Sequence, residues 1–513
     1  MLRRRWSASL LTTLVAAGVL AGTVPAVAQS GSSTAGNSAA GSSSRATTHA
    51  DASSAPSVRL IAPNHEVKAT RFPGQPIYVD PGIFLASVGG AFQINAERPD
   101  YDHPVQAVQV IHGAGGDTVR NLPTGMVTTL DGLPDFFHVV VRKENGKKVA
   151  DQSMLFCPAG IDQRHSSGGP SNPTYPRGCF TGPFTLGQVW GIDRGWAVSA
   201  FGWMGLQFSG KNGSYHVQVS IGKAYREFFG ISNADAVARI TLKVSRDPFT
   251  CRDICPGPDG AAGNSTGLAG SSRTRSLTAA PVDSTPDPST LPDLISLPGW
   301  SISMAPDGGR DYISFAATIW NAGPAPLVVE GYRKQDQAVM KGWQYFYDLG
   351  GNVVGRDRVG TLVYDAREGH THWHFQQFAT YSLLDASQQN VVVSQKEAFC
   401  LAPTDGIDMT VPGAAWNPGS TGLGTACGDA NAIWTREVLH TGWGDTYIQS
   451  LPGQSLDITD LPNGIYYVSI EANPDHVLFE SDYSNNRELR RIHLGGTPGH
   501  RTVVVKPWHG INA

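Results

Sequence analysis

Two low-complexity stretches divide this chain into two segments that are able to fold. Residues 29–57 consist almost entirely of Ser, Gly, Ala, Thr and Asn, and residues 256–290 are rich in Gly, Ser and Pro. Neither stretch has enough apolar residues to offset the entropy lost on folding, so we expect a disordered tether and a linker. We therefore predict an N-terminal domain over 58–255 and a C-terminal domain over 291–498, followed by a tail over 499–513.

Both segments carry the sequence pattern of strands. Short runs of β-branched and aromatic residues recur, among them HVQVSI (216–221), ARITLKV (238–244), YISFAATIW (312–320) and IYYVSI (465–470). The chain has 59 glycines and 34 prolines and few stretches with helical periodicity. This combination predicts an all-β protein made of two β-sandwich-like domains with many turns.

The two segments also look like diverged copies of each other. FCPAGIDQ (156–163) parallels FCLAPTDGID (399–408), and NGSYHVQVSI (212–221) parallels NGIYYVSI (463–470) in the same order. A duplication explains that order, although β domains also share turn and strand vocabulary by chance. The duplication pairs Cys157 with Cys179 and Cys400 with Cys427. Cys251 and Cys255 would then close a small loop at the edge of the linker, and a different role for their spacing is the alternative.

The N-terminus predicts export. Arg3, Arg4 and Arg5 precede an apolar stretch that ends in Ala-Val-Ala at residue 28, so residues 1–28 read as a signal peptide. An even number of cysteines suits an oxidising exterior. No second stretch of about 18 apolar residues follows, so we expect a secreted protein without a membrane span after cleavage. The formal net charge of −4 argues against nucleic acid as a partner.

The motif that carries chemistry is GHTHWHFQQF, residues 369–378. In a strand, His370, His372 and His374 project from one face, because side chains alternate along an extended chain. All three reach one metal ion only where the strand bends or bulges. Neutral imidazoles suit copper or zinc, and three of them leave a coordination position open. A zinc-bound hydroxide at such a site would make a hydrolase.

The wider pattern resembles the lysyl oxidase family. The resemblance runs through HTHWH (370–374), QKEAFCL (395–401), GDTY (444–447), DITDLPNGIYYV (457–468) and ESDYSNN (480–486). These blocks cover about 120 residues in the order of the family. The Ala-rich signal peptide and the absence of familiar animal accessory modules suggest a bacterial member.

The resemblance implies a cofactor and its ligands. The family's copper ligands correspond to His370, His372 and His374. Its lysine tyrosylquinone, which is built from a lysine and a tyrosine with copper and oxygen, corresponds to Lys396 and Tyr447. Taken alone, this lysine would be read as a surface residue and this tyrosine as a strand aromatic.

The implied reaction is the oxidative deamination of a primary amine by molecular oxygen. Its products are an aldehyde, ammonia and hydrogen peroxide. Asp445, two residues before Tyr447, is our candidate for the general base; a turn or capping carboxylate is its alternative role. The expected substrate is peptidyl lysine in a lysine-bearing protein, or a small primary amine.

Two features limit the resemblance. The C-terminal segment has two cysteines where animal members have several disulfides, and Trp443 stands where the animal pattern has a cysteine. In the N-terminal copy, His138, Ser153 and Trp196 occupy the frames of His374, Lys396 and Tyr447, so we expect this copy to be non-catalytic. A His₃ zinc hydrolase and a non-catalytic secreted module that binds copper or cell-wall material remain the alternative functions.

Overall fold

The structure is a computed structural model, and its described residues are 55–72, 74–160, 162–202, 205–246, 286–367, 371–394, 396 and 398–513. The predicted signal peptide, most of the two low-complexity stretches, Cys251, Cys255 and His370 lie outside these residues. Residues 53–513 group into one compact unit. The division into two domains and the duplication therefore stay predictions.

The first half is built from short strands and the short helix α1 (Lys223–Phe229), which is the only α-helix of the described residues. Its strands form four sheets with the orders β1-β4-β12-β10, β11-β5-β6-β7, β13-β3 and β2-β15-β14-β8-β9. The strand bounds are β1 Ser57–Ile61, β2 Glu66–Arg71, β3 Ile77–Val79, β4 Phe84–Val88, β5 Phe92–Glu97, β6 Gln106–Ile111, β7 Thr118–Asn121, β8 Leu133–Lys143, β9 Lys148–Phe156, β10 Asp162–Arg164, β11 Gly187–Ile192, β12 Trp196–Ser199, β13 Leu206–Phe208, β14 Gly213–Ile221 and β15 Val237–Arg246.

The second half contains three larger sheets. Their orders are β16-β18-β28-β26, to which β17 and β29 add by pairing with β18, then β25-β22-β21-β20-β19-β27 and β24-β23-β30-β31-β32. The bounds are η1 Pro288–Thr290, β16 Leu294–Ser296, β17 Trp300–Met304, β18 Tyr312–Asn321, β19 Leu327–Tyr332, β20 Val339–Tyr347, β21 Val353–Asp365, β22 His372–Gln376, β23 Ala379–Leu384, β24 Asn390–Val393, β25 Ala398–Phe399, β26 Asp405–Gly406, η2 Pro418–Ser420, β27 Trp434–Leu439, β28 Trp443–Tyr447, β29 Ser455–Asp457, β30 Gly464–Ala472, β31 Arg487–Thr497 and β32 His500–Val505.

The burial pattern explains why these segments are strands. In β15 the side chains of Ala238, Ile240, Leu242 and Val244 are buried, and Arg239 and Lys243, which alternate with them, are exposed. This alternation marks a sheet with one face on the core and one face in water. The structure confirms the all-β prediction, and the disulfides Cys157–Cys179 and Cys400–Cys427 form as the sequence predicts.

The strand β18 positions the strand that carries the predicted chemistry. β18 is buried along nearly its whole length, as expected for a central strand with an almost continuous apolar sequence. It pairs antiparallel with β28, so that Ile319 lies opposite Asp445 and Ala317 lies opposite Tyr447. These two residues of β28 are therefore held by a strand in the core.

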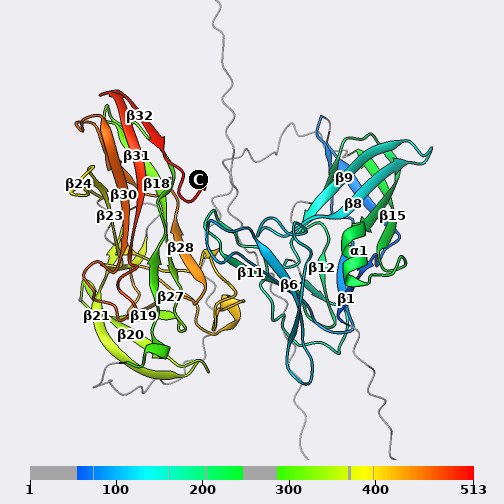
Figure 1. Ribbon diagram of the computed structural model, residues 1–513, viewed down its shortest axis with the longest axis horizontal. Coiled ribbons are helices and arrows are strands. Elements are labelled where there is room, and N and C mark those ends of the chain that lie inside the picture. The colour runs from blue at the N-terminus through cyan, green and yellow to red at the C-terminus, as the bar shows by residue number, and fades with distance from the viewer. Residues whose placement is uncertain are drawn as a thin grey trace, which may run out of the picture. The chain divides into compact units, whose positions relative to one another are not determined.

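Regular structure continues beyond residue 498. β32, within the segment that the sequence assigns to a tail, pairs antiparallel with β31, and β30, β31 and β32 lie side by side (Figure 1). The side chains of β32 alternate between exposed and partly buried, which is the pattern of an edge strand. Among the described residues, no helix is long and apolar enough to cross a membrane.

Candidate active site

Two of the three predicted copper ligands lie on β22. His372 and His374 have ring centroids 4.4 Å apart, with His374 buried and His372 partly exposed. The intervening Trp373 donates its indole N–H to the Asp429 carbonyl at 2.8 Å. The two imidazoles thus lie together, as the alternation predicts. His370, the third predicted ligand, is outside the described residues.

Lys396 and Tyr447 are brought together from distant parts of the chain. The Lys396 ammonium nitrogen lies 4.2 Å from the centre of the Tyr447 ring and 4.8 Å from that of Phe399. The Lys396 side chain is only 5% exposed. Burial lowers the pKa of its amine to about 8, although the nearby Asp445 carboxyl acts in the opposite direction. The lysine therefore lies against the face of the predicted partner tyrosine.

The Tyr447 ring is held at its hydroxyl. This hydroxyl donates to the Cys400 carbonyl and accepts from the Cys400 N–H, both at 3.1 Å. Cys400 is itself fixed by its disulfide to Cys427, and the Phe399 ring packs edge-on against Tyr447 at 5.1 Å. Burial raises the pKa of the Tyr447 phenol well above its usual value. The hydroxyl edge of the ring is thus anchored and neutral.

Asp445 lies on the same strand as Tyr447, two residues earlier. Its carboxyl is buried, and its Oδ2 has no hydrogen-bond partner within the described part of the chain. Burial raises its pKa well above the usual aspartate value, and the Lys396 ammonium opposes that shift. A buried carboxyl with a raised pKa has the proton affinity that a general base needs.

A buried glutamate, which the sequence analysis missed, connects the histidine strand to the segment that follows Lys396. Glu437 on β27 accepts the Phe375 N–H at 3.0 Å and the Leu401 N–H at 3.1 Å, one with each carboxylate oxygen. It is fully buried, and burial raises its pKa. The glutamate therefore fixes His374, one residue before Phe375, relative to Cys400, one residue before Leu401.

A glycine packs directly against the predicted cofactor lysine. The Ser394 hydroxyl donates to the Gly453 carbonyl at 2.7 Å and accepts the Lys396 N–H at 3.1 Å. Gly453 has φ of +84°, and a Cβ there would lie 2.8 Å from the Lys396 Cβ. Glycine is thus required both by the backbone conformation and by the close approach of Lys396. Sequence reasoning did not find this contact, because it depends on the tertiary fold.

Comparison with known proteins identifies this part of the chain. The sequence model of the lysyl oxidase family matches residues 359–504. Residues 359–504 belong to the lysyl oxidase family. The matched range contains both histidines of β22, Lys396, Asp445 and Tyr447, and we refer to it below as the lysyl oxidase segment.

Several relatives support this assignment. The chain is 35% identical over 119 residues to protein-lysine 6-oxidase of Rattus norvegicus, covering 23% of this chain and 25% of the relative. It is 35% identical over 119 residues to protein-lysine 6-oxidase of Sus scrofa, covering 23% and 41%, and 32% identical over 133 residues to lysyl oxidase homolog 2 of Gallus gallus, covering 26% and 15%. The chain therefore spans less than half the length of these relatives.

The residues of the lysyl oxidase segment fit the groups that the family implies. Imidazole nitrogens are suitable copper ligands, and His372 and His374 lie with their rings together. The amine of Lys396 and the ring of Tyr447, the two groups from which the family's quinone would be built, lie 4.2 Å apart. No set of three or more potential ligands gathers at one point among the described residues, which do not include His370.

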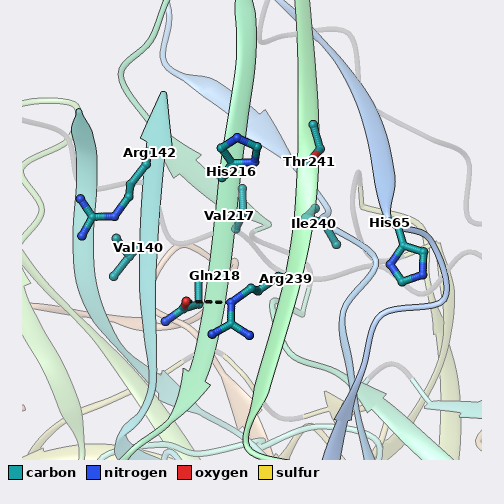
Figure 2. A pocket seen from close by; sticks show the side chains of 9 residues that line it. All are labelled: His65, Val140, Arg142, His216, Val217, Gln218, Arg239, Ile240 and Thr241. Atoms are coloured by element: carbon teal, nitrogen blue, oxygen red, sulfur yellow. Dashed lines mark hydrogen bonds between the residues drawn. The ribbon is translucent and has the colours of Figure 1, made fainter. Parts of the chain in front are cut away.

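The first half has a hollow of a different kind. Figure 2 shows it on the outer face of β8, β14 and β15, where Gln218 accepts a hydrogen bond from Arg239 at 3.0 Å. None of its lining residues belongs to the predicted site. His138, which occupies the frame of His374, forms an exposed pair with Asp151 at 2.6 Å. These polar groups are exposed at the surface of a sheet, and the non-catalytic role of this half stays a prediction.

Proposed function

We propose that the lysyl oxidase segment houses a copper amine oxidase site. The observation that carries the proposal is the contact between the Lys396 amine and the Tyr447 ring, which are 4.2 Å apart in a buried setting. Burying the charged amine of a lysine costs folding free energy. Buried lysines with a shifted pKa are therefore typical of sites in which the amine takes part in the chemistry. The pKa of about 8 leaves a much larger fraction of neutral, nucleophilic amine near neutral pH than a hydrated lysine has.

His370, His372 and His374 are the proposed copper ligands. Lys396 and Tyr447 are the proposed precursors of lysine tyrosylquinone, and Asp445 is the proposed general base. When formed, such a quinone supplies an electron sink for the oxidation of a primary amine by oxygen to an aldehyde, ammonia and hydrogen peroxide.

Three further contributions to the reaction come from side chains and backbone groups around Lys396: they orient the ring, accept a proton and exclude water. The two hydrogen bonds between the Tyr447 hydroxyl and the backbone of Cys400 fix this edge of the ring, so that one ring face stays toward the Lys396 amine. The Asp445 carboxyl, with its raised pKa, accepts the proton that leaves the carbon next to the substrate nitrogen. Burial of Lys396 and Asp445 keeps bulk water away from these groups.

Peptidyl lysine is the proposed substrate, because two of the relatives are named protein-lysine 6-oxidase. Export is part of the proposal, because residues 1–28 have the pattern of a signal peptide.

The test is amine-dependent release of hydrogen peroxide by the copper-loaded protein, measured with a lysine-containing peptide and with a small primary amine. The wild type should release peroxide, whereas Lys396→Met and Tyr447→Phe should not. Hydrolase activity that survives both substitutions would favour a zinc enzyme. The absence of amine-dependent peroxide from copper-loaded wild type would contradict the proposal and favour a non-catalytic module.

A further inference from the structure

The buried glutamate Glu437 lies where the pairing of two strands ends. The strand β22 pairs antiparallel with the short strand β25 at two positions, and the last of them places Phe375 opposite Phe399. The next step of this register would bring His374 opposite Cys400, and among the described residues the ladder stops before that step. The ladder thus ends in the core, beside a proposed copper ligand.

The carboxylate of Glu437 takes one backbone N–H from each of the two chains at this end. One of its oxygens accepts the Phe375 N–H at 3.0 Å, and the other accepts the Leu401 N–H at 3.1 Å. Val438, the next residue of β27, donates its own N–H to the Leu401 carbonyl at 3.3 Å. Buried backbone groups each need a partner, so a ladder that stops in the core needs a substitute acceptor. The fully buried carboxylate of Glu437 is that substitute, and hydrogen bonds to a buried carboxylate are strong.

The end of the ladder leaves the backbone of Cys400 to the tyrosine. The Cys400 N–H donates to the Tyr447 hydroxyl, and the Cys400 carbonyl accepts from it, both at 3.1 Å. The amine of Lys396, two residues before β25, lies 4.2 Å from the centre of the same ring. One glutamate therefore joins the histidine strand to the segment that holds both quinone precursors.

We infer that Glu437 is a positioning residue for the formation of the quinone. The inference rests on the proposed function. In the overall conversion, the Tyr447 phenol and the Lys396 amine consume two molecules of O₂ and release one water and one hydrogen peroxide. The ring gains one oxygen and a carbon–nitrogen bond to the lysine, and the ring and the amine lose the corresponding hydrogens. Glu437 exchanges no atoms in this conversion: it fixes where the ring lies relative to β22, which carries the proposed copper ligands.

The test compares Glu437→Gln with Glu330→Gln. A glutamine at position 437 keeps one oxygen acceptor and turns an amide N–H toward the second backbone N–H, so one of the two hydrogen bonds is lost. Glu330 is the matched control, because it is also buried and lies on β19, the neighbour of β27 in the same sheet. It accepts hydrogen bonds from the side chains of Arg436 at 2.8 Å and Trp434 at 3.1 Å. Its replacement weakens the same sheet and leaves the two backbone N–H groups bound to Glu437.

Each protein is purified without metal, and its melting temperature and the exchange of its backbone amide hydrogens are measured. Saturating Cu²⁺ is then added in air, at an equal interval below each melting temperature, and the bound copper is counted. The cross-linked Lys396–Tyr447 peptide is followed by its mass. Glu437→Asp, whose carboxylate lies one carbon further from both N–H groups, is measured in parallel. This second variant decides the question if Glu437→Gln does not fold.

We expect Glu437→Gln to bind copper at saturation but to cross-link at least about tenfold more slowly, because misplacing reacting groups by about 1 Å costs that much or more. The amide hydrogen of Phe375 or Leu401 should exchange faster in this variant. Glu330→Gln should melt lower, since it leaves Arg436 without its buried carboxylate, and should cross-link at the wild-type rate with both amides protected.

Cross-linking of the folded Glu437 variants at the wild-type rate would overturn the inference. Equal slowing in Glu330→Gln would overturn it as well, because the effect would then follow from the stability of the sheet. A wild type that forms no cross-link would instead overturn the proposed function, on which the inference rests.

Discussion

Burial of the Lys396 amine predicts how the stability of the metal-free protein depends on pH. The pKa of this amine falls from 10.5 to about 8 in the fold. Between these two pH values the unfolded chain binds the proton and the folded chain does not, so unfolding takes up a proton. Stability therefore rises with pH across this window, and below pH 8 the fold carries the full cost of the buried ammonium.

The magnitude follows from the same two pKa values. Each pKa difference of one corresponds to about 1.4 kcal/mol, so the cost below pH 8 is at most about 3 kcal/mol. The aromatic faces of Tyr447 and Phe399 attract the ammonium and reduce that figure. Lys396→Met removes the titrating group and keeps the apolar stem, so this variant should lack the dependence.

The assay is urea unfolding of the metal-free wild type and of Lys396→Met at a series of pH values from neutrality to 10.5. Other lysines and the tyrosines titrate in both proteins and cancel in the difference. We expect the variant to be the more stable protein below pH 8, and the difference to shrink by up to about 3 kcal/mol as the pH rises to 10.5. A difference that does not change with pH would refute the depressed pKa and, with it, the argument for a nucleophilic amine.

Other substitutions test neighbouring parts of the site. Asp445→Asn should lower kcat for amine oxidation by about 10²- to 10⁴-fold while the cross-link still forms, as measured by peroxide release and peptide mass; an unchanged kcat would remove Asp445 as the base. Replacing Cys400 and Cys427 together by Ser should lower the free energy of unfolding by about 3–4 kcal/mol in urea, given a loop of 27 residues; a loss below about 1 kcal/mol would contradict this. Gly453→Ala should cost about 1–3 kcal/mol, because φ is +84° and the added Cβ meets Lys396, and it should slow cross-linking; wild-type stability and rate would show that the contact relaxes freely.

Local patterns were sufficient to predict several features. Alternation along HTHWH predicts that His372 and His374 share a side, and their rings lie 4.4 Å apart. Matched blocks in the two halves predict the disulfides Cys157–Cys179 and Cys400–Cys427 of the described residues. The resemblance to a family, rather than any local pattern, predicts that Lys396 and Tyr447 belong together.

Other features depend on contacts between distant segments. Glu437 stands in an alternating strand where a carboxylate would ordinarily face water, and only the fold reveals that two backbone N–H groups meet it in the core. Gly453 resembles an ordinary turn residue in the sequence, and its role depends on the close approach of Lys396, which only the fold reveals. The strand β32 lies in the segment 499–513 that the sequence analysis treats as a tail, and its pairing with β31 is revealed only by the fold.

The central claim is that Lys396 and Tyr447 become one cross-linked quinone, and peptide mass spectrometry tests it most directly. The protein is loaded with Cu²⁺ in air, digested and compared with protein kept free of metal. We expect the copper-loaded sample to yield a single species that contains both the Lys396 and the Tyr447 peptides, with the mass of the added oxygen and of the hydrogens lost. Two separate, unmodified peptides after copper loading would contradict the account.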